Sequence, residues 1–320
     1  MQIGFYIFSI IVIIGTLLPL NSSKHWFIRD QTYFKVYYFL FNGILLLIYS
    51  LLFKLTWLVS ILIFSHWGCA ILSFRVIKSY FQFSPTKVSD VTNKAEVTAL
   101  KILVFNVLYD NNDYQSFINL VNKDQPDAIL LLETGQAWDD NLKPLYQNYN
   151  HIVKKIQEDT YGIIFMSKIP FLESCVNHFV VNTTPSIEAL IKIKDRYIRI
   201  YGIHPEPPIP GERLTTMPKD LELILTARRI LSHDEKELSI LVGDLNDVGW
   251  SAISKKFRKI TGMKDPREGR GFYASFPTYL PIRIPIDHIF CSPGFELISL
   301  ERHPNIGSDH YPMSVTFAVI

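Results

Sequence analysis

The sequence has few cysteines and almost no net charge, and both features restrict what the protein can do. Only three cysteines occur in 320 residues, Cys69, Cys175 and Cys291, and none has the spacing of a metal-binding pair. Cys69 falls in a long apolar run, so the only disulfide left open is one between Cys175 and Cys291. The formal net charge is only +2, so the chain lacks the general basic character that is typical of nucleic-acid-binding proteins.

Long apolar runs are abundant at the N-terminus. Residues 3–20 carry no charge and are long enough to cross a hydrocarbon layer of roughly 30 Å. Residues 33–53 and 55–74 repeat the pattern, interrupted only by occasional polar residues such as Asn42 and His66. These runs predict three transmembrane helices and a multi-pass location in the cell membrane.

Two alternatives fit these runs less well. The first run could be a cleaved signal peptide, but no basic segment precedes it and no small-x-small cleavage site precedes Asn21. Residues 33–74 could instead form an apolar helical hairpin in the core of a soluble protein, but they lack helical polar periodicity.

Charges around the runs predict which side of the membrane the rest of the chain occupies. The first loop is flanked by the basic residues Lys24, Arg29 and Lys35. The last run is followed by Arg75, Lys78 and Lys87, whereas the loop on the other side of the membrane carries only Lys54. Because cytoplasmic loops are enriched in lysine and arginine, this count predicts that the first loop and the rest of the chain after the last run lie in the cytoplasm.

Strand-like and helix-like segments alternate beyond the apolar runs. A polar stretch with Pro85 predicts a linker at 81–97 between a membrane anchor at 1–80 and a folded domain at 98–320. We predict strands at 100–107, 128–133, 151–156, 162–167, 175–181, 187–193, 197–202, 239–243, 287–291, 297–302 and 313–319, and helices at 114–122, 218–232 and 251–261. Many strands with few helices favour an α/β (α+β) fold of two packed β-sheets flanked by helices.

Polar side chains follow several of these apolar runs in a fixed order. They are Asn106 in VFNV, Glu133 in LLLET, His204 in GIHP, Asp244 and Asn246 in VGDLND, and Asp309 and His310 in GSDH. Buried strands that end in polar residues deliver those residues to one edge of a sheet. Carboxylates and an amide suit a hard divalent cation, a carboxylate can accept a proton from water, and a histidine can stabilise phosphoryl oxygens, so the set predicts phosphate-ester hydrolysis.

Spacing within two motifs gives further expectations. Asp244 and Asn246 alternate, so both side chains point to one side if the chain is still extended there. Asp309 and His310 are adjacent, which places them on opposite faces of an extended segment and argues against a simple Asp/His pair.

The motifs FNV, LLLE, YGIIFMSK, GIHP, GDLND, IDHIF and GSDH together resemble the endonuclease/exonuclease/phosphatase superfamily over residues 98–320. The resemblance implies a four-layer DNase-like sandwich of two mixed β-sheets and a metal-dependent hydrolase of phosphate esters. GDLNDVGWS, GRGFYASF and HWFIRD are similar to a bacterial membrane-anchored subgroup related to teicoplanin-resistance membrane proteins. That similarity implies an outward-facing domain, opposite to the charge count.

The resemblance also implies roles for individual residues. Glu133 becomes the principal Mg²⁺ ligand, with Asn106 and Asp309 beside it, and Mn²⁺ is a possible substitute. Asp244 polarises the attacking water, and Asn246 and His204 bind phosphate oxygens. His310, paired with Asp287, donates to the phosphoryl group. Tyr161 is a candidate for substrate binding, although Tyr161, Asp247 and His288 could equally be packing or turn residues.

Departures from the superfamily pattern bear on the substrate. Leu108 stands where apurinic endonucleases carry a further acid, so one metal or two remains open. The proline-rich segment 205–210 is too short for the DNA-inserting elements of repair enzymes, which disfavours damage-specific cleavage. We expect a phosphate ester or diphosphate as substrate, and the three predicted membrane helices favour one that is linked to a lipid of the bilayer. Nucleic acid is the alternative, a catalytically silent membrane scaffold is a remote one, and no protein partner is inferable.

Overall fold

A computed structural model describes residues 2–92, 97–208 and 214–320 of the chain. The chain forms two compact units. One consists of Met1–Ser84 with Pro208–Met217, and the other of Pro85–Pro207 with Pro218–Ile320. Residues 93–96 of the predicted linker and residues 209–210 of the proline-rich segment lie outside the described residues.

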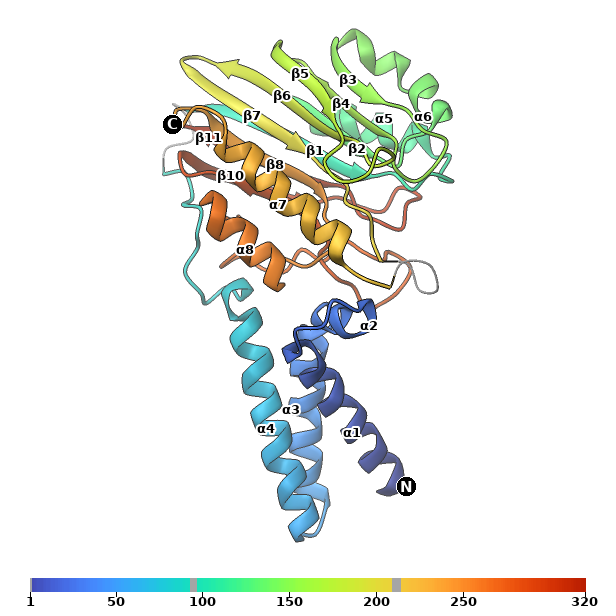
Figure 1. The fold of residues 1–320 in the computed structure, drawn as a ribbon, viewed down its shortest axis with the longest axis vertical. Helices are drawn as coiled ribbons and strands as arrows, with labels where there is room; N and C mark the ends of the chain where they lie inside the picture. The colour runs from blue at the N-terminus through green and yellow to red at the C-terminus, as the bar shows by residue number, and fades with distance from the viewer. Residues whose placement is uncertain (1, 93–96, 209–213) are drawn as a thin grey trace. The chain divides into compact units, whose positions relative to one another are not determined.

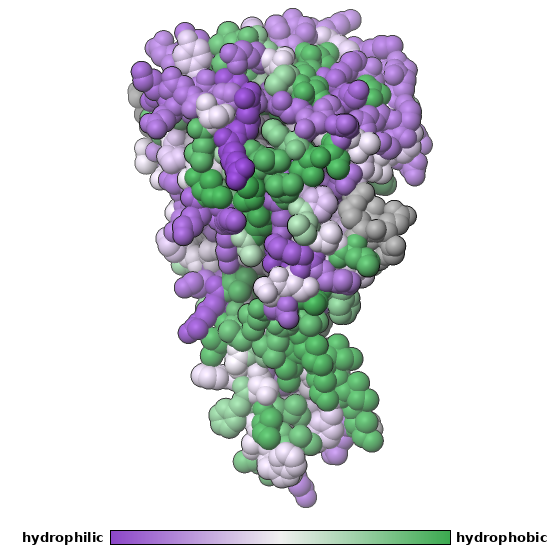
Figure 2. Space-filling view, viewed as in Figure 1, coloured by the Kyte–Doolittle hydropathy of each residue, from purple (hydrophilic) through white to green (hydrophobic). Residues whose placement is uncertain are grey.

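The first unit contains three long helices, α1 (Gln2–Leu17), α3 (Lys35–Leu52) and α4 (Trp57–Ile77), and a short α2 (Trp26–Arg29). Short 3-10 turns extend some of these helices, and the apolar stretches Gln2–Leu20, Lys35–Leu52 and Trp57–Tyr80 are long and apolar enough to cross a membrane. Their outward side chains are largely apolar (Figure 2). Length and composition therefore fit the transmembrane prediction.

Polar side chains join the three long helices in their interior. The Asn42 amide donates to Thr16 Oγ1 of α1 at 3.0 Å, and Asn42 Oδ1 lies 2.7 Å from His66 Nδ1 of α4. Such interhelical hydrogen bonds stabilise helix contacts in lipid because the alternative is a polar group facing hydrocarbon.

The second unit is built on two mixed β-sheets (Figure 1). The six-stranded sheet has the order β10-β11-β1-β2-β4-β3, and the five-stranded sheet has the order β5-β6-β7-β8-β9. In each sheet one pair is parallel, β1 with β2 and β7 with β8, and the other pairs are antiparallel. The strands are β1 Thr98–Asn106, β2 Ala128–Leu132, β3 His151–Lys155, β4 Ile163–Ser167, β5 Phe171–Asn177, β6 Ser186–Ile193, β7 Arg196–Gly202, β8 Leu238–Asp244, β9 Asp287–Cys291, β10 Phe295–Arg302 and β11 Met313–Val319.

Helices cover the outer faces of both sheets, which gives four layers. α5 (Tyr114–Asp124) and α6 (Gln136–Asn141) pack on the six-stranded sheet, and α7 (Met217–Leu231) and α8 (Ala252–Thr261) pack on the five-stranded one. Apolar side chains from both sheets form the core between them. The two mixed sheets flanked by helices confirm the predicted fold class.

Individual elements follow from local sequence. Asp113 caps α5 by accepting from Ser116 N at 3.2 Å, and the apolar face of α5 buries Phe117 against Phe105 of β1. Ser251 caps α8 in the same way through Ser254 N at 3.1 Å.

Some predicted elements are displaced or incomplete. The strand predicted at 175–181 lies instead at Phe171–Asn177, because its mostly exposed residues give no clear inward and outward alternation. The short α6 and the 3-10 helix η4 (Lys143–Gln147) were not predicted. Part of the predicted linker binds the edge of β10, where Val91 N donates to the Leu297 carbonyl at 3.0 Å. All three cysteines are free, so the disulfide left open between Cys175 and Cys291 is not formed.

Candidate active site

The six-stranded sheet brings four of the predicted residues to one of its ends. Asn106 is the last residue of β1, and Glu133 directly follows β2. The two strands are parallel, so both residues lie at the carboxyl end of the sheet. β11 runs antiparallel to β1, and the segment with Asp309 and His310 therefore enters at the same end.

The five-stranded sheet does the same for the remaining residues. His204 lies two residues beyond β7, and Asp244 is the last residue of β8, parallel to β7. Asp287 begins β9 and is paired directly with Asp244. Gly243, with φ +148°, is required here because a Cβ would lie 1.9 Å from the Ile203 carbonyl oxygen.

Asn106 connects the two sheets at the site. Its Nδ2 donates to Glu133 Oε1 at 2.8 Å and to Asp244 Oδ2 at 3.2 Å, and its Oδ1 accepts from Leu108 N at 3.1 Å. Glu133 adopts φ +61°, a left-handed conformation rather than a continuing strand, and Glu133 Oε2 accepts from Tyr109 N at 3.3 Å. As placed, Asn106 presents donors to the two carboxylates and orients them. Its predicted role as an oxygen ligand would require the opposite amide orientation.

Two histidines face the same carboxylates. His204 Nε2 lies 3.7 Å from Asp244 Oδ2 and 4.0 Å from Glu133 Oε1. His310 Nε2 lies 3.5 Å from Asp244 Oδ2, and its Nδ1 is 2.8 Å from Asp287 Oδ2. The Asp287 carboxylate thus orients the His310 ring, and Nε2 faces Asp244.

The extended backbone assumed for two of the motifs is not present, although Asp244 and Asn246 both line one cavity. β8 ends at Asp244, and Asn246 has φ +47°, so the chain turns between them. In that turn Asn246 N donates to Asp244 Oδ1 at 2.8 Å, and Asn246 Nδ2 donates to the Pro205 carbonyl at 3.0 Å. Asp309 and His310 likewise lie on a bend instead of an extended segment, and both line one cavity.

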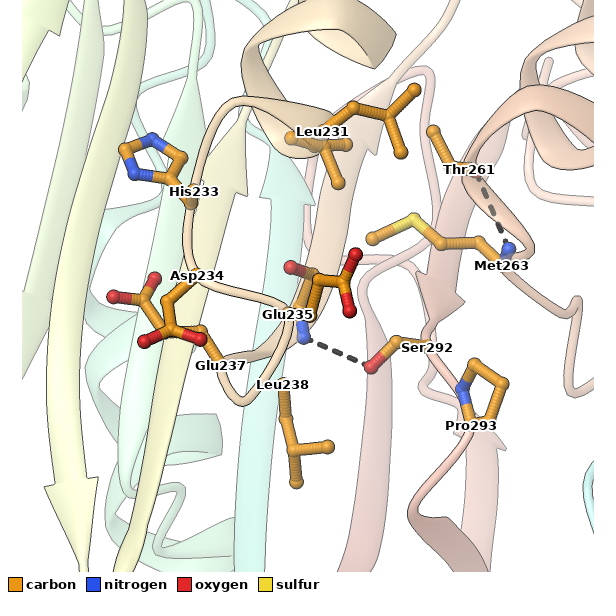
Figure 3. Close-up of a pocket in the computed structure, with 12 residues that line it drawn as sticks. Leu231, His233, Asp234, Glu235, Glu237, Leu238, Thr261, Met263, Ser292 and Pro293 are labelled. Atoms are coloured by element: carbon orange, nitrogen blue, oxygen red, sulfur yellow. Dashed lines mark hydrogen bonds between the residues drawn. The ribbon is translucent and has the colours of Figure 1, made fainter.

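That cavity has a volume of about 240 Å³. It is lined by the predicted Tyr161, whose ring centroid is 5.7 Å from that of His204, and by Phe276, whose ring centroid is 4.8 Å from that of His310. The remaining lining residues are Glu133, Thr160, Pro207, Asp244, Asn246, Ile286, Asp309 and His310. A larger cavity of about 360 Å³ lies at the opposite end of β8, between the end of α7 and Ser292 (Figure 3). It contains none of the predicted site residues.

Burial and neighbouring charges set the protonation of the site. Burial raises the pKa of Glu133 above its ordinary value, and it raises that of Asp244 to about 7. Burial would lower the pKa of His310, but the carboxylates of Asp287 and Asp244 raise it to about 10. Two effects lower the pKa of His204 to about 3: burial is the larger one, and the positive charge of His310 is the smaller one. At neutral pH His310 is therefore a cation and His204 is neutral, so the contacts of His204 with the carboxylates are not ion pairs.

The donor chemistry fits a divalent cation. Glu133, Asp244 and Asp309 bring carboxylates to one cavity, and Asp309 raises the pKa of Glu133 further, so an added positive charge would stabilise their ionised forms. A cation is also sterically compatible with Asp244, Asp287 and His310, whose donor atoms all lie within 4.8 Å of one another. In that trio Asp287 and His310 already satisfy each other. We therefore favour Glu133 and Asp309 as the ligands.

Comparison with known proteins identifies the family. A sequence model of the Endonuclease/Exonuclease/phosphatase family matches residues 103–310, which is more than half of the chain. The chain belongs to this family. It is accordingly a metal-dependent hydrolase of phosphate ester bonds. No curated protein matches the chain, and the resemblance to a teicoplanin-resistance subgroup has no further support.

Solved structures share the fold of the second unit. D. rerio TDP2 complexed with single strand DNA product is 19% identical, with a TM-score of 0.59 over 69% of this chain and 100% of that chain. The human nocturnin catalytic domain with bound sulfate is 14% identical, with a TM-score of 0.57 over 69% and 95%. An endonuclease/exonuclease/phosphatase family protein from Bacteroides thetaiotaomicron is 15% identical, with a TM-score of 0.57 over 70% and 99%.

Sequence reasoning missed several residues at the site. Ser308 Oγ donates to the Asn106 carbonyl at 2.7 Å and accepts from His310 N at 3.0 Å, which holds the GSDH bend against β1. The serine is part of the motif, but its type alone gives no such signal. Phe276 is the last residue of the GRGFYASF motif, for which the sequence comparison implies no role in catalysis, and the fold places its ring 4.8 Å from that of His310.

Proposed function

We propose that the protein is a membrane-anchored, Mg²⁺-dependent phosphoesterase that hydrolyses a phosphate ester or diphosphate, with a lipid-linked phosphate as the preferred substrate. The observation that carries this proposal is a single cavity lined by three carboxylates and two histidines, one of which, His310, is held by Asp287 at 2.8 Å. Residues 1–80 would form the anchor and residues 98–320 the catalytic domain.

The residues of the chain divide the work of an in-line displacement by water. Asp244, with a pKa raised by burial to about 7, accepts a proton from the attacking water and positions it. Asn246 and neutral His204 donate to phosphate oxygens. His310, held as a cation by Asp287, donates from Nε2 to a phosphoryl oxygen as negative charge develops there.

The ligands of the cation would be Glu133 and Asp309, with Asn106 fixing the orientation of Glu133 through its amide. When bound, Mg²⁺ would neutralise charge on the phosphate oxygens and so favour attack. Mn²⁺ has similar preferences for oxygen ligands and is the expected substitute.

The exposed side chains of a loop beside the cavity favour a substrate that is held in a bilayer. Tyr279 is 72% exposed and Leu280 is 46% exposed, although both are large and hydrophobic. The same loop is attached to the site, because Thr278 N donates to the Asp309 carbonyl at 2.9 Å. Amphipathic tyrosine and exposed leucine are common at membrane interfaces.

Basic side chains accompany this loop. The guanidinium groups of Arg283 and Arg302 lie 5.1 Å and 4.6 Å from the centre of the Tyr311 ring, next to His310. Apolar and basic residues together are suited to the boundary between acyl chains and phosphate head groups. Confinement of enzyme and substrate to one membrane would also raise their effective concentration.

A membrane-tethered nuclease is the second candidate. The observation that favours it is the shared fold with D. rerio TDP2, which was solved with a single strand DNA product.

A substrate comparison decides between the two candidates. We would assay the full chain in mixed micelles with Mg²⁺ on a polyprenyl diphosphate, a water-soluble diphosphate with the same head group, and single- and double-stranded DNA. Faster hydrolysis of the lipid is expected, with no activity for Glu133→Gln. DNA cleavage without lipid hydrolysis would reject the lipid substrate and establish the nuclease.

A loop variant tests the role of the exposed residues. Tyr279→Ser with Leu280→Ser should slow hydrolysis of the lipid substrate while leaving the soluble analogue unchanged. Leu172→Ser with Tyr197→Ser, which changes residues 53% and 40% exposed on the five-stranded sheet, is the matched control and should alter neither rate.

A further inference from the structure

A row of buried charged and polar side chains lies directly behind the site. It consists of Lys219, Asp247, His288, Arg267 and Asp265, which are between 0% and 3% exposed. None of them lines the catalytic cavity. We call this row the rear network.

Arg267 is the centre of the rear network. Its Nε lies 2.9 Å from Asp265 Oδ1, and its Nη2 lies 2.8 Å from Asp265 Oδ2, so the guanidinium and the carboxylate form a two-point pair. Its Nη1 donates to the backbone carbonyl of Asp287 at 3.1 Å. Arg267 thus holds the residue that orients His310.

His288 continues the network from Arg267. Arginine can only donate, so the contact of Arg267 Nη2 with His288 Nδ1 requires that nitrogen to accept. The proton of the neutral ring must then be on Nε2, which donates to the Asp247 carbonyl at 2.7 Å. Burial and the neighbouring Arg267 lower the pKa of His288 to about 3, in agreement with a neutral ring.

Lys219 closes the network on the side of the Asp244 turn. Its Nζ donates to the Asn246 carbonyl at 2.7 Å and lies 3.2 Å from Asp247 Oδ2. The network therefore donates hydrogen bonds to three backbone carbonyls. Those of Asn246 and Asp247 lie in the turn after β8, and that of Asp287 lies at the start of β9. Its two cations and two anions compensate each other, which makes deep burial tolerable.

We propose that the rear network fixes the position of the Asp287–His310 pair relative to the Asp244–Asn246 turn, and that Arg267 and His288 are positioning residues for phosphate-ester hydrolysis. This inference rests on the proposed function. Asp244 and Asp287 are direct strand partners, but Asn246 lies beyond β8 and adopts a left-handed conformation. Beyond the strand ladder, Asn246 contacts Asp244 Oδ1 and the Pro205 carbonyl, and the carbonyl contacts of His288 and Lys219 attach the same turn to the rear network.

Three variants test the role of the network without leaving an isolated buried charge. Asp265→Leu with Arg267→Met removes the ion pair as a whole. His288→Phe keeps a ring of similar size but loses both hydrogen bonds, and His288→Gln retains a donor that can reach the Asp247 carbonyl. If the double variant does not fold, the two His288 variants decide the question.

The first readout is the kinetics of the full chain on bis(4-nitrophenyl) phosphate with Mg²⁺ or Mn²⁺. We expect His288→Phe and the double variant to lower kcat by about 10–100-fold, the usual cost of losing a supporting partner, with KM changed less than about twofold. His288→Gln should recover part of kcat. The second readout needs no substrate: the downfield proton signal of the His310 ring N–H bonded to Asp287, assigned by its absence in Asp287→Asn, should shift or disappear in His288→Phe.

The matched control is Arg199→Met. Arg199 is equally buried and lies 2.7 Å from Glu188 on the five-stranded sheet, outside the site. It should lower the unfolding midpoint but leave kcat and the His310 signal unchanged. The proposal is overturned if folded His288→Phe keeps both wild-type kcat and the wild-type signal, or if Arg199→Met loses kcat equally. A wild-type chain without activity on any phosphate ester would reject the proposed function, and the His310 signal would still decide for or against the rear network.

Discussion

Replacing Asp287 by asparagine isolates the contribution of one buried charge to catalysis. The carboxylate lies 2.8 Å from His310 Nδ1, and both side chains are almost fully buried. A hydrogen bond to a charged group contributes about 1.5–3 kcal/mol. If His310 acts as a cation in the transition state, losing this term lowers kcat by about 10–150-fold.

The same energy predicts the shift in pH dependence. At about 1.36 kcal/mol per pKa unit, 1.5–3 kcal/mol lowers the His310 pKa by about 1–2 units. His310 is active as the protonated form, so the alkaline limb of the pH–rate profile moves to lower pH. The pH dependence of stability has the same sign. Because the pKa of His310 is raised in the folded protein, protonation of His310 stabilises the fold fully at pH values below the pKa of the unfolded chain. This stabilisation is lost as the pH rises towards about 10. The depressed pKa of Asp287, below its ordinary value because His310 outweighs the effect of burial, gives stability that is lost as pH falls.

The assay combines pH–rate profiles of kcat/KM with Mg²⁺ titrations of wild type and variant. Asp124→Asn is the control, because Asp124 contacts another histidine, His303, at 3.6 Å outside the site. It should leave the profile unchanged. An unmoved alkaline limb in Asp287→Asn would refute the charge argument, and a large loss of Mg²⁺ affinity would instead make Asp287 a metal ligand.

Three further outcomes are expected. Glu133→Gln should reduce hydrolysis by at least about 100-fold without unfolding the protein, and near-normal turnover on any substrate of the wild type would exclude Glu133 as a ligand. Excess EDTA should stop the reaction, and Mg²⁺ or Mn²⁺ should restore it better than Zn²⁺ because the proposed ligands are oxygen donors; full activity in chelator would contradict this. Burial raises the pKa of Glu222 to about 7, so ionisation of this carboxyl lowers the stability of the fold as pH rises from about 4.5 to about 7. Glu222→Gln should therefore be more stable than wild type at pH 8, by on the order of 1–3 kcal/mol in the free energy of unfolding. Equal unfolding midpoints of the wild type at pH 5 and pH 8 would rule this out.

The sequence was sufficient for the elements whose pattern is strong. β9 and β11 occupy the predicted residues, because Ser292 and Pro293 directly follow the first strand and Pro312 directly precedes the second. The endpoints of parallel strands were equally informative, since Asn106 and Glu133 could be assigned to one edge before their contacts were known. Periodicity carries this information because burial is repeated along a regular element.

Features that depend on irregular backbone could not be predicted in this way. Glu133 and Asn246 both adopt positive φ, which aims their side chains in directions that strand alternation cannot give. The Arg267 contacts join segments 20 or 21 residues apart in the sequence through hydrogen bonds, and no periodic pattern records them. In the sequence, charged residues that form buried ion pairs cannot be distinguished from the charged residues of an exposed loop.

The order of strands in the six-stranded sheet has a consequence for synthesis of the protein on the ribosome. β1 is bordered by β2 on one side and by β11 on the other, and Thr98 at the start of β1 is paired with Val319 at the end of β11. The nascent chain cannot complete this sheet, or place His310 beside Asp287, until β11 has left the exit tunnel. The long apolar helices precede β1 in the sequence and emerge before it. Translation therefore separates in time the exposure of the apolar N-terminal segments from the appearance of a working catalytic centre.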